Sequence, residues 1–126
     1  MNLKVTFPGN LRVDAEYGPF TIPTNQDGTA PPPWALFLAS IGTCAGIYVL
    51  SFCKQRGLPT DGLEIIQKMD SDPFTNMIKK ITLDIHLPAG FPEKYKAAII
   101  RSADQCAVKQ HMIEPPQFEI NTITPE

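Results

Sequence analysis

A chain of 126 residues, with 43% hydrophobic and 19% charged side chains, has the composition of one folded domain and not of a disordered segment. Its formal net charge is −2, and its longest run of positive residues is Lys79-Lys80. Nucleic-acid-binding domains concentrate many Lys and Arg side chains on one face. We therefore predict a single domain, residues 1–126, that does not bind nucleic acid.

The N-terminus and the cysteine content indicate the compartment. The first residues, MNLKVTFPGNLRVDAEYG, lack the basic start and apolar run of a secretory signal. Three cysteines do not make the disulfide framework of a small secreted protein. We expect a cytoplasmic protein with free thiols, most of which pack as inert small hydrophobic side chains.

The first 22 residues have the alternation of a β-meander. Apolar side chains occupy every second position at Leu3, Val5, Phe7, Leu11, Val13 and Ala15. Turn residues separate these runs at 8–10 and 17–19, and a short strand is expected at 20–22. This pattern predicts an antiparallel sheet with one solvent-facing side, followed by a loop over 24–33.

The stretch from Gly28 to Cys53 has no charged side chain, and it predicts a helix from Pro33 to Cys53. Its length would suffice to cross a membrane, so a membrane-anchored protein is one interpretation. Five small or polar residues dilute the stretch, namely Ser40, Gly42, Thr43, Gly46 and Ser51. Because strand patterns lie on both sides of it, we favour a helix buried on all sides inside a protein that is not in a membrane.

The second half of the chain continues an α+β pattern. Two strands are expected at 63–69 and 77–87, joined by a hairpin at 71–74. Pro92 and Glu93 open a second helix, and Cys106 terminates its apolar face. A last short strand is expected at Phe118 and Ile120.

Cys44 is the candidate chemical centre of the first helix. Cys53 follows nine residues later, which is about half a turn at 100° per residue, so the two thiols point to opposite sides. A thiolate in the middle of a helix gains little from the helix dipole and needs a cation from another segment. Arg12 is the arginine of the N-terminal strands that could supply it. Cys106 is either a buried core thiol or a resolving partner that condenses with an oxidised cysteine.

Metal and cofactor motifs are missing from the sequence. Cys106 and His111 are five residues apart, but no CxxC or HxxxH spacing occurs. No GxGxxG, GxxxxGK[ST] or GxSxG motif occurs either. We predict neither a metal site nor a cofactor.

Two segments carry a resemblance to a known family. PWALFLASIGTC at 33–44 and SADQCAV at 102–108 resemble the OsmC/Ohr family of osmotically induced and organic hydroperoxide resistance proteins. The order of the expected strands and helices also fits nearly the whole chain. The resemblance implies an α+β OsmC-like fold, with antiparallel strands around a long buried central helix, and an intertwined homodimer.

The resemblance also implies roles for individual residues. Cys44 would attack a hydroperoxide and become a sulfenic acid, and Cys106 would resolve it as a disulfide that external thiols reduce. Arg12 would stabilise the Cys44 thiolate. The family has a glutamate just after the proline that starts the central helix, and Trp34 occupies that position here, with Glu16 or Asp27 as candidate replacements.

The sequence therefore supports two main hypotheses. The first is a cytoplasmic, homodimeric thiol-dependent peroxidase for oxidative stress defence. Trp34, Phe37 and Tyr48 would contact an organic hydroperoxide, and an external thiol would be the reductant. The alternative is a non-catalytic small-molecule-binding or accessory protein on the same scaffold, in which Trp34 replaces the acidic residue and fills an apolar pocket.

Overall fold

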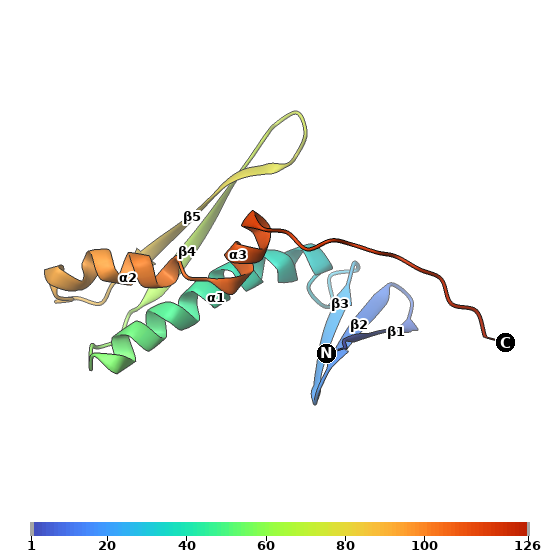
Figure 1. Ribbon diagram of the computed structural model, residues 1–126, viewed down its shortest axis with the longest axis horizontal. Helices are drawn as coiled ribbons and strands as arrows, with labels where there is room; N and C mark the ends of the chain where they lie inside the picture. Colours follow the sequence, from blue (N-terminus) through green and yellow to red (C-terminus); the bar gives the residue numbers. More distant parts are fainter. Residues whose placement is uncertain (1, 126) are drawn as a thin grey trace. The chain divides into compact units, whose positions relative to one another are not determined.

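The computed structural model describes residues 2–125, which form two compact units (Figure 1). The first unit ends at Ser40 and the second begins at Ile41. The first contains β1 (Lys4–Gly9), β2 (Arg12–Tyr17) and β3 (Phe20–Asn25). Helix α1 (Pro33–Gln55) starts in the first unit and continues into the second.

Strands β1, β2 and β3 form the predicted antiparallel meander, with β2 in the centre. Ala15 of β2 pairs with Val5 on one side and with Ile22 on the other. The turn between β2 and β3 places Gly18 at φ 55°, a backbone conformation that glycine adopts without steric cost. The alternation of the sequence therefore predicted this sheet correctly.

The buried side chains of the first unit are polar. Asp14, Thr24 and Asn25 are buried, whereas none of the apolar residues among 2–40 is. Asn25 accepts hydrogen from the backbone N–H of Asp27 at 3.1 Å and donates to Thr29 at 3.0 Å, so it ties the end of β3 to the following loop. The meander thus has no hydrophobic core of its own.

Helix α1 begins at Pro33 and ends at Gln55. Proline suits a first turn because its missing N–H has no intrahelical partner there. At the other end Gly57 has φ 62°, and the Leu58 N–H donates to the Cys53 carbonyl at 2.9 Å, which closes the helix. The bounds of the helix therefore follow from local sequence.

Burial of α1 is one-sided in the single chain. Its buried side chains are Ile41, Ala45, Val49, Phe52 and Cys53, which recur at helical spacing. Ile47, on another face, is 54% exposed. By length and composition α1 also satisfies the criteria for a membrane span, as does the central helix of many folded domains. We expected a helix buried on all sides. Within a single chain, only one stripe of α1 is buried.

The second unit contains a β-hairpin and three short helical segments. Strands β4 (Glu64–Ser71) and β5 (Ile78–His86) pair antiparallel, with Gln67 opposite Leu83. The Asp72 carboxylate accepts the Phe74 N–H at 2.8 Å and so shapes the hairpin loop. A 3-10 turn (Glu93–Tyr95), α2 (Lys96–Ala103) and α3 (Ala107–Ile113) follow.

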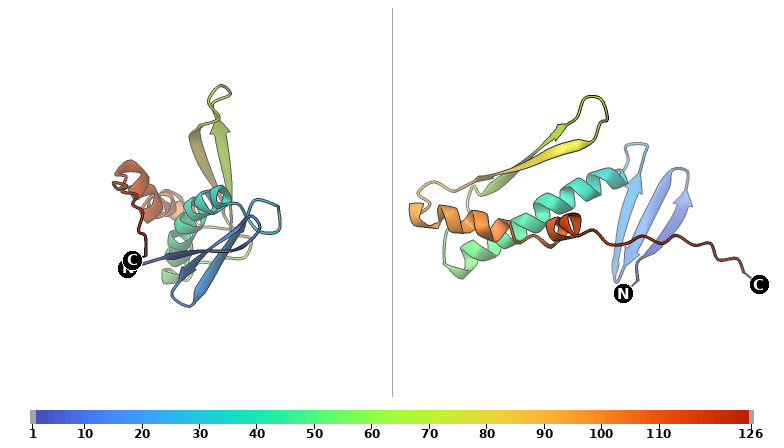
Figure 2. Two further views of the ribbon diagram at one scale, coloured as in Figure 1. Left: turned by 90° about the vertical axis from the view of Figure 1, so that its right-hand side faces the viewer. Right: turned by 45° about the horizontal axis from the view of Figure 1, so that its top comes forward.

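The core of the second unit lies where α1, α2 and the hairpin meet (Figures 1 and 2). Its buried members are Val49, Phe52, Cys53, Phe91 and Ile99. Helix α2 lies beside the C-terminal half of α1, and the Ser102 hydroxyl donates to the Tyr48 carbonyl at 3.2 Å. The Phe52 and Tyr95 rings meet edge to face, 5.9 Å apart.

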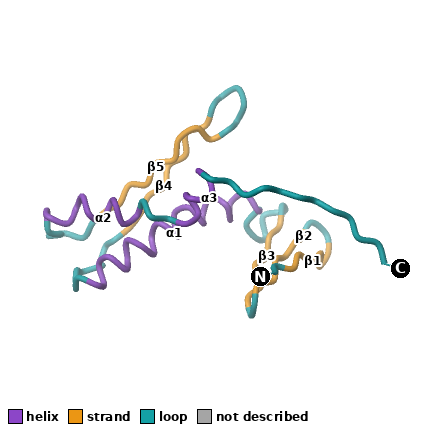
Figure 3. Tube along the Cα trace, viewed as in Figure 1, coloured by secondary structure: helices purple, strands orange, loops and turns teal. Residues whose placement is uncertain are grey.

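Two expectations about the C-terminal region were wrong. The second helix is not continuous, because Cys106 adopts an extended conformation (φ −53°, ψ 123°) that separates α2 from α3. No strand forms at Phe118 and Ile120, which are 86% and 93% exposed in an irregular segment (Figure 3). A strand needs a neighbouring sheet edge for its hydrogen bonds, and this segment pairs with none among residues 2–125.

Candidate active site

The structure brings Cys44 and Cys106 together, although 62 positions separate them in the sequence. Cys44 lies midway along α1, and Cys106 immediately precedes α3. The two side chains interact, and each shifts the pKa of the other. The Cys106 sulfur also lies 4.0 Å from the carbonyl oxygen of Ile41, which is on the turn of α1 before Cys44.

The break between α2 and α3 creates this arrangement. Because the chain bends at Cys106, the first backbone N–H groups of α3 face the Cys44 sulfur, and those of Val108 and Ala107 donate to it. An unbroken helix would have directed these N–H groups to its own carbonyl oxygens. The residue that interrupts the helix is thus also the second thiol of the site.

Two glycines of α1 near Cys44 face side chains of the hairpin strand β4. A Cβ added at Gly42 would stand 2.6 Å from the Gln67 amide oxygen, well inside van der Waals contact. A Cβ at Gly46 would meet Ile65 at an ordinary 3.8 Å. Gly42 therefore leaves room for the end of the Gln67 side chain of β4, which would have to shift if a Cβ were present.

The two thiols of the site have pKa values shifted in opposite directions. Hydrogen bonds from the Val108 N–H, from the Cys106 side chain and from the Ala107 N–H lower the pKa of Cys44. Burial, together with the hydrogen bond to Cys44, raises the pKa of Cys106. Cys44 therefore ionises before Cys106.

We expect alkylation of Cys44 by iodoacetamide to reach half of its maximal rate at a lower pH than alkylation of an unstructured cysteine peptide. The reason is that the thiolate is the reactive form, and a lowered pKa maintains it as the pH falls. Peptide mapping by mass spectrometry after timed alkylation measures the profile. Cys53 is the internal control, because burial raises its pKa. Coincident profiles for Cys44 and the peptide would contradict the assignment.

Arg12 lies in β2 of the first unit and is held by an acid that the sequence reasoning missed. Its Nε and Nη2 atoms donate to the two Asp14 carboxylate oxygens at 3.0 and 2.9 Å. Asp14 is only 4% exposed, and its hydrogen bonds and charge raise the pKa of Arg12. Neither Glu16 nor Asp27 holds this arginine. The i, i+2 spacing on one strand, which places both side chains on the same face, was the available signal.

The three aromatic residues expected to contact substrate lie in different surroundings. Trp34 and Phe37, on the first turns of α1, stack with ring centroids 5.1 Å apart. Trp34 is 58% exposed, so it does not fill a pocket within the single chain. Tyr48 lines a groove of the second unit that is separate from the aromatic pair.

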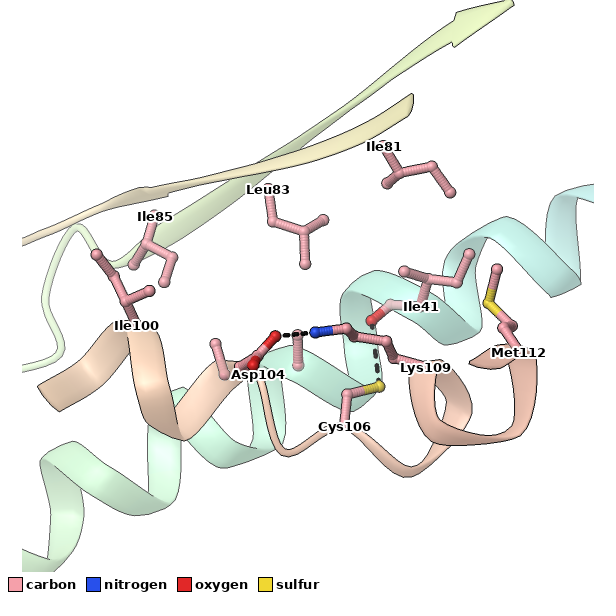
Figure 4. Close-up of a pocket in the computed structure, with 11 residues that line it drawn as sticks. Ile41, Ile81, Leu83, Ile85, Ile100, Asp104, Cys106, Lys109 and Met112 are labelled. Atoms are coloured by element: carbon pink, nitrogen blue, oxygen red, sulfur yellow. Dashed lines mark hydrogen bonds and ion pairs between the residues drawn. The ribbon is translucent and has the colours of Figure 1, made fainter. Parts of the chain in front are cut away.

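An apolar cavity of about 420 Å³ lies against the Cys106 sulfur. Figure 4 shows it between β5 on one side and α1, α2 and α3 on the other. Its wall is mainly aliphatic, with Ile41, Ile81, Leu83, Ile85 and Ile100. Lys109 and Asp104 form an ion pair beside Cys106. The volume is within the range of small-molecule pockets.

Metal binding has no support among residues 2–125, where no group of three or more His, Cys, Asp or Glu side chains is placed to hold an ion. The three cysteines are free thiols. The chemistry available at Cys44 and Cys106 is therefore that of two neighbouring thiols with different acidities.

The family profile for OsmC-like proteins matches residues 26–121. The chain belongs to the OsmC-like protein family. The matched region includes both cysteines of the site, whereas Arg12 lies before it. No curated protein matches the sequence.

Solved structures show that the OsmC-like fold extends beyond the matched region. A candidate osmotic stress induced and detoxification response protein from Psychrobacter arcticus 273-4 is 21% identical, with a TM-score of 0.66. The similarity covers 87% of this chain and 86% of that one. A hypothetical protein from Aquifex aeolicus VF5 is 18% identical, with a TM-score of 0.72 over 90% of this chain and 86% of that one. At these identities the likeness shows the fold alone, which agrees with the predicted α+β class.

Proposed function

We propose that this protein is a thiol-dependent peroxidase that reduces organic hydroperoxides in the cytoplasm as part of oxidative stress defence. The observation that carries the proposal is the pairing of Cys44, whose pKa is lowered by three hydrogen bonds, with the protonated thiol of Cys106. Nucleophilic cysteines require such activation, because the thiolate and not the thiol is the reactive form.

The first step would be attack of the Cys44 thiolate on the terminal oxygen of the hydroperoxide. A sulfur–oxygen bond forms while the oxygen–oxygen bond breaks. Cys44 is oxidised to a sulfenic acid, and the hydroperoxide is reduced to an alcohol, whose oxygen takes a proton from solvent or from the site. The Val108 and Ala107 N–H groups, which donate to the sulfur, hold it in place for the attack.

The second step would close a disulfide between the two cysteines. The Cys106 sulfur attacks the Cys44 sulfenic acid, a sulfur–sulfur bond forms, and the hydroxyl leaves with the Cys106 proton as water. Two equivalents of an external thiol then reduce the disulfide and regenerate both thiols. The interaction of the two side chains, in which each shifts the pKa of the other, supports this step.

The aliphatic cavity beside Cys106 supports an organic rather than an inorganic peroxide, because a cavity of about 420 Å³ accommodates a hydrocarbon group. Trp34, Phe37 and Tyr48 would contact the organic group of the substrate. Arg12 would stabilise the Cys44 thiolate, as the family resemblance implies. Consumption of cumene hydroperoxide by the reduced protein, compared with a Cys44→Ser variant, tests the proposal.

A second candidate function is non-catalytic binding of an apolar small molecule. The same cavity, together with Trp34 at the position of the family's acid, favours it. Quenching of the single tryptophan by an apolar ligand, to the same extent in the wild type and in the Cys44→Ser variant, would support this alternative.

We also propose that the protein is a homodimer. The first unit buries no apolar side chain among residues 2–40, and the C-terminal segment exposes Phe118, Ile120 and Ile123. A sheet of three strands needs a covered hydrophobic face for stability, and a second copy would provide one. Sedimentation equilibrium should give twice the chain mass of 13.9 kDa. A species of 13.9 kDa at micromolar concentration would contradict the proposal.

A further inference from the structure

A second cavity of the second unit differs in chemistry from the site around the cysteines. It has a volume of about 590 Å³ and lies between the C-terminal half of α1 and α2. Its lining residues are Tyr48, Ser51, Phe52, Gln55, Arg56, Ala98, Arg101, Ser102 and Gln105. We call it the arginine groove. It contains two guanidinium groups and no carboxylate, although the whole chain has a net charge of −2.

Arg56 is held in a fixed orientation in this groove. Its guanidinium carbon lies 3.7 Å above the centre of the Phe52 ring, and its Nη1 atom donates to the Phe52 carbonyl at 3.2 Å. A stacked guanidinium loses less rotational freedom when it binds a further partner. Only one of the five N–H groups of Arg56 is used by these contacts.

Several backbone carbonyl groups around the groove already have donors. The Tyr48 carbonyl accepts from Ser102, and the Phe52 carbonyl accepts from Arg56. At the end of α1, the Cys53 carbonyl accepts from the backbone N–H groups of Arg56 and Leu58. At the end of α2, the Ile100 carbonyl accepts from the Asp104 N–H, and the Ser102 carbonyl accepts from the Gln105 N–H. The charged groups that the groove offers to a ligand are therefore its two guanidinium groups.

Arg101 contributes most of these free donors. Its guanidinium makes no ion pair or hydrogen bond with any residue among 2–125. Asp104, the acid three positions later, is engaged by Lys109 instead. Positively charged N–H donors without an anionic partner attract oxygen acceptors that carry negative charge.

We propose that the arginine groove binds a small organic anion through a carboxylate or phosphate-ester group. Arg56 and Arg101 would bind the anionic oxygens, and the hydroxyl and amide side chains would contact the remainder of the molecule. The volume accommodates a molecule of several carbon atoms rather than a single ion. Neither Cys44 nor Cys106 lines the groove, and its existence does not depend on the proposed peroxidase activity.

Isothermal titration calorimetry of the full-length protein with citrate and, separately, with inorganic phosphate tests the proposal. We expect saturable 1:1 binding, and stronger binding of one probe identifies the carboxylate or the phosphate as the preferred group. The Arg101→Gln variant should bind the preferred probe about tenfold more weakly or worse, because it loses a charge-assisted hydrogen-bond partner. The Arg56→Gln variant should show a loss in the same direction.

Lys79→Gln is the matched control, because it removes one positive charge from β5, outside the groove. It should bind within about twofold of the wild type, since an exposed charge at a distance is screened by salt. An equal loss in Lys79→Gln and Arg101→Gln would show non-specific charge attraction and overturn the proposal. Absence of saturable binding below about 10 mM would also overturn it. If Arg101→Gln converted a dimer to a monomer, a second copy of the chain would occupy the groove. That result would also overturn the proposal.

Discussion

Replacement of Cys44 by serine is expected to reduce thiol-dependent consumption of cumene hydroperoxide by at least about a thousandfold. A serine hydroxyl ionises far above physiological pH and is a poor nucleophile toward peroxide oxygen. The hydrogen bonds that lower the pKa of Cys44 cannot compensate for this difference. The rest of the site should be preserved, because serine is close to cysteine in size.

The measurement is the initial rate of hydroperoxide loss with excess dithiothreitol, at equal concentrations of folded protein. Cys53→Ala is the matched control on the same helix, because Cys53 lies in the core and burial raises its pKa. It should retain the wild-type rate, and a thermal melt of each variant checks that it is folded. Equal rates for wild type and Cys44→Ser would exclude the peroxidase function and favour the ligand-binding alternative.

Replacement of Cys106 by serine should stop the reaction after its first half. The variant retains the Cys44 nucleophile but has no neighbouring thiol to displace the hydroxyl of the sulfenic acid. With one equivalent of hydroperoxide and no external thiol, the wild type should lose two free thiols and form the Cys44–Cys106 disulfide. The variant should lose only Cys44 and should give about one dimedone adduct per chain.

Mass spectrometry of the intact protein and of its peptides distinguishes these products. The Cys53→Ala protein should form the same disulfide as the wild type, since Cys53 is buried in the core cluster with its pKa raised. A disulfide that included Cys53 would contradict the assignment of Cys106 as the resolving cysteine. The same assignment would be contradicted if the wild type accumulated the dimedone adduct as readily as the Cys106→Ser variant.

Much of the fold follows from local sequence. Alternating side chains predicted β1 to β3, and the bounds of α1 agree with Pro33 and Gly57, because both residues act through their own backbone. The family resemblance at 33–44 and 102–108 correctly indicated the OsmC-like family. The Arg12–Asp14 pair was also within reach of sequence reasoning, because its i, i+2 spacing is local.

Other features depend on segments that are distant in the chain. The interruption at Cys106 was missed because helical spacing continues across it, and the bend is stabilised by contacts with Ile41 and Cys44 of α1. The expected strand at Phe118 was wrong because a strand requires a paired edge as well as an alternating pattern. The arginine groove was also not visible in the sequence, since Arg56 and Arg101 belong to different helices.

The sequence by itself determined the identity and order of the reactive groups: an uncharged helix that carries Cys44 and a later segment that carries Cys106. Only the tertiary structure decided that the two thiols meet and that Cys44 is the more acidic. The physical reason is that thiol acidity depends on the donors that surround the sulfur. Those donors come from α3, whose N–H groups reach Cys44 because the chain bends at Cys106.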